Sequence, residues 1–319
     1  MASKRREKKP LARFKATLGD VGKRPDRALR ARYPQIDRTR ALALLKGKQI
    51  KVNGVVARLS TILAEGDSVK INDEKLGAPV AHGILVKHFE GGLFVVQKPA
   101  GLAMHEGTGI VENLRSSLIT LLPGRGLKES RVTPRFFGRL DRPTSGLVLG
   151  AITDSADKKV RPYWENGEIE KVYLALVHGR TKEEALVDHP LARRKEQHRG
   201  KGESEEARTR YKALFRSKSI SLLRVKLETG RTHQIRRHMK GIGHPIIGDL
   251  RYGDHRLDER LVGNSQGELD GLYLHCHAFI PSKDIPLMPE QLSADFPPRF
   301  ASLLQSLGAP EKYFQNVDL

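Results

Sequence analysis

The sequence predicts an α+β fold built around a mixed, largely antiparallel sheet. Two observations favour this class. Short runs rich in β-branched and aromatic residues outnumber the stretches with helical periodicity, and the two kinds do not alternate as they do in a doubly wound parallel sheet. At 319 residues the chain is long enough for two domains. We therefore expect a small N-terminal module followed by a larger domain.

The composition divides the chain into four segments. Residues 1–20 are rich in lysine and arginine and lack an apolar run, so we expect a basic, disordered arm rather than a secretory signal. Residues 21–72 have the pattern of a small folded module, and residues 73–83 contain few bulky apolar side chains and are expected to form a linker. The larger domain is expected to cover residues 84–319.

The expected module combines two helices with a hairpin. One helix is predicted over residues 26–33, and Asp37 is placed to cap a second helix that runs to Lys46, with Gly47 at its C-terminal stop. Asn53 and Gly54 separate two short apolar runs, which is the strongest sequence signal for a hairpin with a type I′ turn. A further strand is predicted over residues 63–71.

The larger domain is expected to consist mainly of strands. The predicted strands cover residues 93–96, 147–152, 172–177, 211–215, 222–228 and 272–279. The predicted helices cover residues 111–122, 156–166, 233–241 and 300–307.

The charge of the chain indicates a polyanionic partner. There are 57 lysines and arginines against 37 acidic residues, the net charge is +20, and the pI is about 10.1. Nucleic acid is favoured over a membrane surface, because there is neither a long apolar run nor a basic amphipathic helix with bulky aromatic residues. The single cysteine, Cys276, excludes an internal disulfide and fits a reducing compartment, so we expect the cytoplasm.

One carboxylate, Asp141, stands between Arg139 and Arg142 in the stretch G-R-L-D-R-P-T-S-G-L-V-L-G. A turn and a buried strand are predicted directly after it, so the aspartate would lie at the end of a strand. A charge partly removed from water needs partners, and carboxylates in such surroundings cluster at active sites. An aspartate that merely caps its own turn is the ordinary alternative for an isolated D-x-x-S pattern.

Three stretches together resemble the RluA-type pseudouridine synthases. G-R-L-D-R-P-T-S-G resembles the family motif H-R-L-D-R-x-T-S-G, and V-V-Q-K-P-A-G resembles the strand that ends in K-P-x-G. T-G-R-T-H-Q-I-R, followed by G-H-P-I-I-G-D-L-R-Y-G, resembles a further signature of the family. The matches run in family order over about residues 20–280, and H-E-G-T-G and R-Y-G-D look most like subtype C. The N-terminal module resembles the S4 domain, which presents a basic face to folded RNA.

The resemblance implies a reaction and a set of site residues. Asp141 would act on the target uridine, either as a nucleophile at C1′ or as a base at C2′, and Arg231 would form an ion pair with it. Tyr173 would pack on the uracil and help to remove the C5 proton, while Arg139 would enter the RNA stack in place of the extruded uridine. The expected substrate-binding residues are Arg139, Arg142, Lys98, His105, Arg38 and Arg40.

The implied function is the isomerisation of specific uridines in large-subunit (23S) ribosomal RNA to pseudouridine. This reaction exchanges an N1 bond for a C5 bond and requires no cofactor, in keeping with the lack of a phosphate-cradling G-x-x-x-x-G-K-S/T or G-x-G-x-x-G motif in the sequence. The S4-like module favours ribosomal RNA, and transfer RNA is the alternative substrate. We expect a monomer without a membrane partner.

Two other classes of protein are alternatives. His275 and His277 with His233 and His238 invite a zinc hydrolase, but the latter pair is five residues apart and no H-E-x-x-H or C-x-x-C is present, so we predict no metal site. A non-catalytic RNA-binding or ribosome-associated protein is the other alternative, and the joint presence of the three implied catalytic residues disfavours it.

The sequence also departs from the family pattern. Gly138 stands where a histidine is usual, Pro143 where an acidic residue is common, and Gln97 where an asparagine usually precedes K-P. These departures bear on how the loop before Asp141 meets RNA.

Overall fold

The computed structural model divides the chain into two compact units. One consists of residues 1–85 and 106–112, and the other of residues 86–105 and 113–319. The residues that the structure describes are 12–33, 38–71, 83–105, 113–122, 133–192, 204–265 and 269–315.

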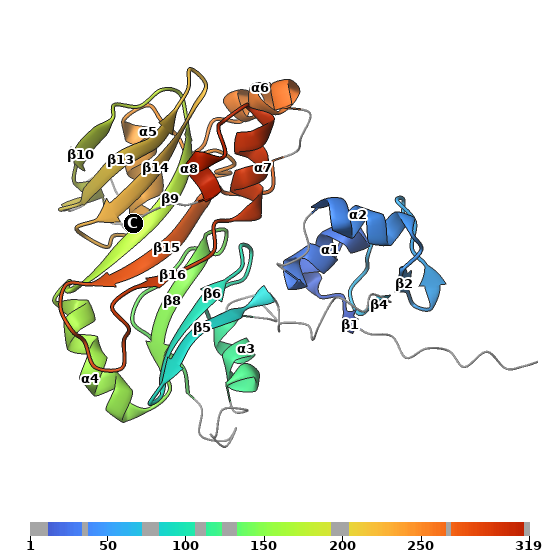
Figure 1. The fold of residues 1–319 in the computed structure, drawn as a ribbon, viewed down its shortest axis with the longest axis horizontal. Helices are drawn as coiled ribbons and strands as arrows, with labels where there is room; N and C mark the ends of the chain where they lie inside the picture. Colours follow the sequence, from blue (N-terminus) through green and yellow to red (C-terminus); the bar gives the residue numbers. More distant parts are fainter. Residues whose placement is uncertain are drawn as a thin grey trace, which may run out of the picture. The chain divides into compact units, whose positions relative to one another are not determined.

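The smaller unit is a four-stranded antiparallel sheet with two helices (Figure 1). The strand order is β1-β4-β2-β3, and a core that includes Leu29, Tyr33, Leu45 and Ile50 is completely or almost completely buried. Its elements are β1 (Ala12–Lys15), η1 (Leu18–Asp20), α1 (Pro25–Arg32), α2 (Arg38–Lys46), β2 (Ile50–Val52), β3 (Val55–Val56) and β4 (Ser68–Ile71).

The hairpin of this unit has the expected type I′ turn, because Asn53 and Gly54 both have positive φ angles, 51° and 86°. The expected strand over residues 63–71 is shorter and begins at Ser68. The proposed N-cap, Asp37, lies outside the described residues.

The expected boundary of the basic arm at residue 20 is wrong, because β1 and η1 already belong to the folded unit. Residues 12–15 pair with β4 and so cover its edge. Asp20 is buried, and its two carboxylate oxygens accept hydrogen bonds from Arg32 at 2.9 and 2.5 Å. These hydrogen bonds lower the pKa of Asp20, although burial by itself would raise it. The segment between β1 and α1 is therefore part of the fold.

The larger unit is organised around a ten-stranded sheet with the path β10-β13-β14-β9-β15-β8-β6-β5, to which β7 and β16 are added at β8 and β15. Its strands are β5 (Leu85–Glu90), β6 (Leu93–Lys98), β7 (Arg135–Phe136), β8 (Ser145–Ala151), β9 (Ile169–His178), β10 (Glu184–Asp188), β13 (Arg208–Arg216), β14 (Ile220–Leu227), β15 (Leu274–Pro281) and β16 (Leu292–Ser293), and β11 (Leu191–Ala192) pairs separately with β12 (Ser204–Glu205).

The helices of this unit lie around the sheet, with α5 against β13 and α4 against β8 (Figure 1). They are α3 (Leu114–Leu121), α4 (Asp154–Glu165), α5 (Gln234–Gly241), α6 (His255–Ser265), α7 (Pro298–Ser306) and α8 (Lys312–Gln315). The four helices expected from the sequence correspond to α3, α4, α5 and α7, whereas α6 and α8 were not expected. None of the helices in the described part of the chain combines the length and apolarity needed to cross a bilayer.

The sheet is mixed and largely antiparallel, as predicted. β8 and β15 run parallel, while β9 pairs antiparallel with both β14 and β15, and β6 with β8. All seven residues of β8 are buried, because this strand lies inside the sheet and is covered. A single turn joins Asp141 to the start of β8 at Ser145, so a buried central strand fixes the position of that carboxylate.

Candidate active site

A cavity of about 260 Å³ lies beside Asp141. Side chains from β8, β9, β15, α4 and the start of α5 line it. This volume is near the lower end for small-molecule sites and suits one nucleoside better than a longer piece of a nucleic acid chain.

Asp141 is held in a turn at the entrance to β8. Its backbone carbonyl accepts a hydrogen bond from the Thr144 N–H at 3.0 Å, and its side chain remains 25% exposed. Gly146 follows where β8 passes β15, with φ at +115°, and a Cβ there would lie 2.2 Å from the Cys276 carbonyl oxygen. Only glycine fits this position, which explains the glycine of the T-S-G sequence.

Arg236 connects Asp141 to a second carboxylate. Its Nη1 donates to Asp141 Oδ2 at 2.9 Å, while Nε and Nη2 donate to the two oxygens of Asp249 at 2.7 Å each. Burial lowers the pKa of Arg236, but the hydrogen bonds with Asp249 and Asp141 outweigh that effect and raise it. Asp249 also accepts hydrogen bonds from the backbone N–H groups of Arg251 and Tyr252. The guanidinium that faces Asp141 is therefore charged and fixed in place.

The expected ion pair between Arg231 and Asp141 is wrong. Arg231 Nε donates to the Glu206 carbonyl at 3.0 Å and lies 4.0 Å from the Glu205 carboxylate, although the residue does line the cavity. The physical reason is that the Arg231 guanidinium is held at the end of β12 instead, by the Glu206 carbonyl and near the Glu205 carboxylate. Both arginines belong to T-G-R-T-H-Q-I-R, and only Arg236 is on the helix.

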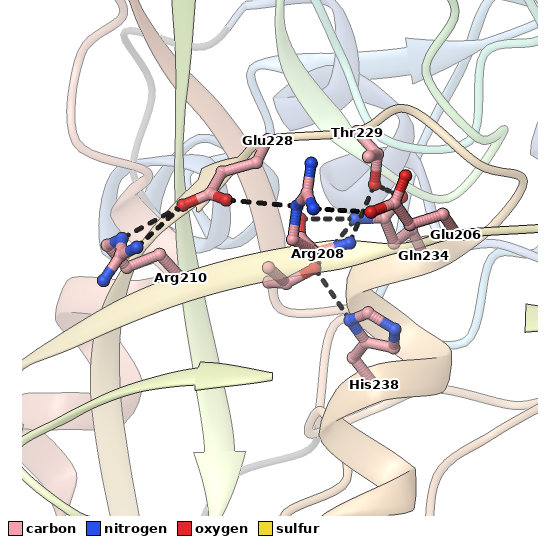
Figure 2. Close-up of polar contacts among 8 residues, drawn as sticks. Glu206, Arg208, Arg210, Glu228, Thr229, Gln234 and His238 are labelled. Carbon is pink, nitrogen blue, oxygen red and sulfur yellow. Dashed lines mark hydrogen bonds and ion pairs between the residues drawn. The ribbon is translucent and has the colours of Figure 1, made fainter. Parts of the chain in front are cut away.

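Gln234 fastens the start of α5 to the sheet, as Figure 2 shows. Its amide oxygen accepts from the Thr229 hydroxyl at 2.8 Å and from the Arg231 N–H at 2.9 Å. Its amide nitrogen donates to the Arg208 carbonyl and to the Thr209 hydroxyl, both at 2.9 Å. One buried side chain thus satisfies several polar groups at once and fixes the helix that carries Arg236.

His233 is a second neighbour of Asp141 that the sequence did not reveal in this role. It has φ at +55°, an uncommon backbone conformation for a residue with a side chain. Its Nε2 lies 3.5 Å from Asp141 Oδ1, and its Nδ1 is 3.0 Å from the Tyr252 hydroxyl. The two carboxylate oxygens of Asp141 therefore face different groups, Arg236 on one side and His233 on the other.

Tyr173 lies on β9, lines the cavity and is 8% exposed. It pairs in register with Cys276 of β15. Burial raises the pKa of Tyr173 well above its usual range, and the Cys276 thiol and Asp141 add to this effect. The residue is therefore a neutral phenol at neutral pH.

The expected substrate-binding residues fall into three groups. Arg139 is exposed and lines the cavity. Arg142 is also exposed, but its Nε donates to the Gly101 carbonyl at 3.0 Å. His105 is half-buried against the Phe136 ring. Arg38 and Arg40 lie on α2, and their side chains are outside the described part.

Lys98 does not fit the expected contact with substrate. Its side chain is completely buried, and its ammonium group donates to the carbonyls of Pro99, Leu102 and Arg142. Burial, together with the nearby positive charge of Arg299, lowers the pKa of Lys98 to about 7. Lys98 therefore ties the K-P-x-G loop to the turn that carries Asp141.

Three of the four histidines of the zinc alternative, His233, His238 and His275, have separate hydrogen-bond partners. His238 contacts Thr209 and the His189 carbonyl, whereas His275 contacts the Ser145 hydroxyl at 2.8 Å. Within the described ranges, no three side chains of histidine, cysteine, aspartate or glutamate are grouped to hold a metal ion.

Two solved structures share this fold. The structure titled Human RNA Pseudouridylate Synthase Domain Containing 4 matches with a TM-score of 0.58 and 24% identity, over 70% of this chain and 92% of its own. Human RNA Pseudouridylate Synthase Domain Containing 1 matches with a TM-score of 0.52 and 21% identity, over 67% of this chain and 84% of its own. The larger unit therefore has the pseudouridine synthase fold.

Sequence comparison extends this from fold to family. The family model described as RNA pseudouridylate synthase matches residues 92–240. Ribosomal large subunit pseudouridine synthase D of Nitrosomonas europaea is 33% identical over 73% of this chain and 70% of its own length. Ribosomal large subunit pseudouridine synthase C of Escherichia coli K12 is 30% identical over 82% of this chain and 86% of its own length. The chain belongs to the RNA pseudouridylate synthase family, in its RluA-type branch, and is an RNA pseudouridine synthase.

Proposed function

We propose that this enzyme isomerises specific uridines of large-subunit (23S) ribosomal RNA, with Asp141 as the catalytic carboxylate and without a cofactor. The observation that carries the proposal is the position of Asp141, which lies at a cavity of nucleoside size with one oxygen bonded to a fixed arginine. The names of the similar proteins, which are large-subunit pseudouridine synthases, support ribosomal RNA as the substrate.

Asp141 acts on the sugar of a uridine that has been extruded into the cavity. In one route its carboxylate attacks C1′ and the N1–C1′ bond breaks, with the electron pair leaving on the uracil. The uracil turns, C5 attacks C1′, the carboxylate leaves, the C5 proton is removed and N1 gains a proton. In the other route Asp141 first removes the C2′ proton. Arg236 serves both routes because it compensates the charge of Asp141 while Asp249 holds it in place.

Tyr173 provides the surface on which the uracil packs in this proposal. Its ring belongs to the wall of the same cavity as Asp141, and a neutral phenol offers both an aromatic face and an O–H group. Burial keeps the phenol of Tyr173 protonated. The phenol oxygen can therefore accept the C5 proton only if its own O–H proton is transferred to another acceptor at the same time.

The smaller unit contributes RNA affinity. Three basic residues stand side by side across its sheet, because Lys70 of β4 pairs with Arg13 of β1 and with Lys51 of β2. Like charges at directly opposite positions destabilise a sheet, so this basic row is suited to bind phosphates. A cytoplasmic monomer completes the proposal, in keeping with the single free cysteine.

The experiment is pseudouridine mapping of total RNA from cells that lack the gene, complemented with the wild-type gene or with Asp141→Asn. Wild type should restore pseudouridine at defined positions of the large-subunit RNA, and Asp141→Asn should not. The purified variant should keep most of its RNA affinity, because only one carboxylate oxygen is replaced. If the restored pseudouridines lay only in transfer RNA, transfer RNA and not ribosomal RNA would be the substrate. Turnover by Asp141→Asn would contradict the role of the carboxylate.

A further inference from the structure

A lysine that the reaction does not use lines the cavity. Lys171 lies two residues before Tyr173 on β9, so the two side chains share one face of the sheet. It is half-buried, and its Nζ lies 4.6 Å from the centre of the Trp164 ring. Burial lowers the pKa of Lys171. The charged form of this side chain is therefore costly in this cavity.

Lys171 forms no ion pair with a carboxylate in the described part of the chain. The adjacent Glu170 points to the opposite face, where it pairs with Lys226 and lies 3.7 Å from Arg224. Glu168 pairs with Lys283. Buried charges in proteins are ordinarily paired, so a half-buried ammonium that lies over an aromatic ring and has no carboxylate partner among the described residues is suited to an anion that arrives with a ligand.

Trp164 holds this ammonium in place, and Gly138 makes room for Trp164. The indole packs edge-on against Phe279 with ring centroids 5.6 Å apart, and Phe279 pairs in register with Lys171. A Cβ at Gly138 would lie 2.5 Å from Trp164 Cζ2. The glycine that stands in place of the usual histidine therefore allows the indole to reach the cavity wall under Lys171.

We propose that Lys171, held over Trp164, binds one phosphate group of the RNA strand next to the uridine that enters the cavity. The inference rests on RNA being the substrate. An ammonium group is a compact point charge that suits a phosphate oxygen, and an extruded nucleotide brings its own phosphates to the cavity that Asp141 shares with Lys171. The second contact with the strand explains why a charge is kept in this costly position.

The test compares Lys171→Met with Lys159→Met in the full chain. Methionine keeps the length and apolar volume of the stem, and Lys159 is an exposed lysine of α4, so it controls for the loss of one charge. RNA dissociation constants are measured across a range of salt concentrations with a large-subunit RNA fragment that the wild type modifies. Thermal unfolding is measured for both variants.

Lys171→Met should weaken RNA binding about three- to tenfold near 0.1 M salt and reduce the slope of log K against log salt by about 0.7 to 0.9, the effect of one phosphate contact. Lys159→Met should change neither quantity appreciably. Lys171→Met should unfold at the same temperature as the wild type or above it, because a desolvated charge is removed. A lower unfolding temperature with unchanged RNA affinity would overturn the proposal and make Lys171 a structural partner of Trp164.

A neutral methylphosphonate in the RNA backbone identifies the phosphate. At the contacted position it should weaken wild-type binding and have no further effect on Lys171→Met, whereas at more distant positions the two losses should add. Additive losses at every position flanking the target uridine would contradict the inference. Wild-type pseudouridine formation on the same RNA is the reference, since its failure would count against the proposed substrate and not against Lys171 alone.

Discussion

Arg236 Nη1 donates to Asp141 Oδ2 at 2.9 Å, and this contact joins residues that are 95 positions apart. The same guanidinium is bidentate to Asp249, whose side chain is completely buried. Arg236 therefore fixes the turn that carries Asp141 and neutralises a buried carboxylate at the same time.

Replacement of Arg236 should affect stability and catalysis together. Arg236→Gln leaves Asp249 as an uncompensated buried charge, so we expect a loss of about 3 to 5 kcal/mol in the free energy of unfolding. Isomerisation should fall below detection. Arg231→Gln should change stability by less than about 1 kcal/mol, because Arg231 is partly exposed and its nearest carboxylate is 4.0 Å away. Urea unfolding and single-turnover assays measure both effects, and a larger loss for Arg231→Gln would reverse the assignment.

Tyr173→Phe separates stacking from proton transfer, because it removes one oxygen and keeps the ring. RNA affinity should change by less than about 1 kcal/mol. The single-turnover rate should fall at least about 10²-fold, the lower end for a general acid or base. Tyr173→Leu should also weaken binding, since base stacking on an aromatic ring contributes about 1 to 3 kcal/mol. If Tyr173→Phe had the wild-type single-turnover rate, the hydroxyl would have no chemical role and Tyr173 would serve only in packing.

Gly138→Ala should be costly because the new methyl group collides with the Trp164 ring. We expect a loss of about 1 to 3 kcal/mol in the free energy of unfolding and slower isomerisation. In a Trp164→Phe background, which lacks the colliding atom, the cost of Gly138→Ala should fall by at least about 0.5 kcal/mol. Gly263→Ala on α6 is the control, since a Cβ there meets open space. Equal costs in both backgrounds would show that the two positions are independent.

The larger unit should lose stability as the pH falls from about 6.5 to about 4. Burial, assisted by the nearby Arg224, lowers the pKa of His277 to about 4, and burial and His277 lower that of His275 well below its usual range. The unfolded chain then binds protons before the folded chain does, so the contribution of His277 is complete above pH 6.5 and falls by roughly 3 kcal/mol toward pH 4. The free energy of unfolding of His277→Gln, followed against pH, should have a shallower slope. The exposed His255→Gln control should keep the wild-type slope.

The basic row of the smaller unit should contribute phosphate contacts. Replacing Arg13, Lys51 and Lys70 together with glutamine should reduce the slope of log K against log salt by about 2 to 3. Stability should stay constant or rise, because like charges at adjacent sheet positions are removed. The matched control replaces three exposed lysines of the other unit, Lys182, Lys212 and Lys218. Equal slopes for the two triple variants would exclude a specific role for the row.

The sequence predicted the features that depend on local pattern. The type I′ turn at Asn53 and Gly54 follows from residues that tolerate positive φ, and the central strand after Asp141 follows from an uninterrupted apolar run. The sheet class and the strands on either side of the cavity follow from the same signals. The early edge strand over Ala12–Lys15 was missed because its sequence, A-R-F-K, has little apolar content and acquires its conformation by pairing with β4.

By itself the sequence determined that the candidate site contains an aspartate, a tyrosine and an arginine, in that order along the chain. Only the tertiary structure decided which arginine meets Asp141. Arg231 and Arg236 belong to one motif, and the choice depends on where α5 begins and on how Gln234 fastens it to β13. The same holds for Gly138, whose missing side chain is explained by Trp164 from a different element. Ion pairs and steric contacts act through space between segments far apart in the chain, so a local pattern cannot specify them.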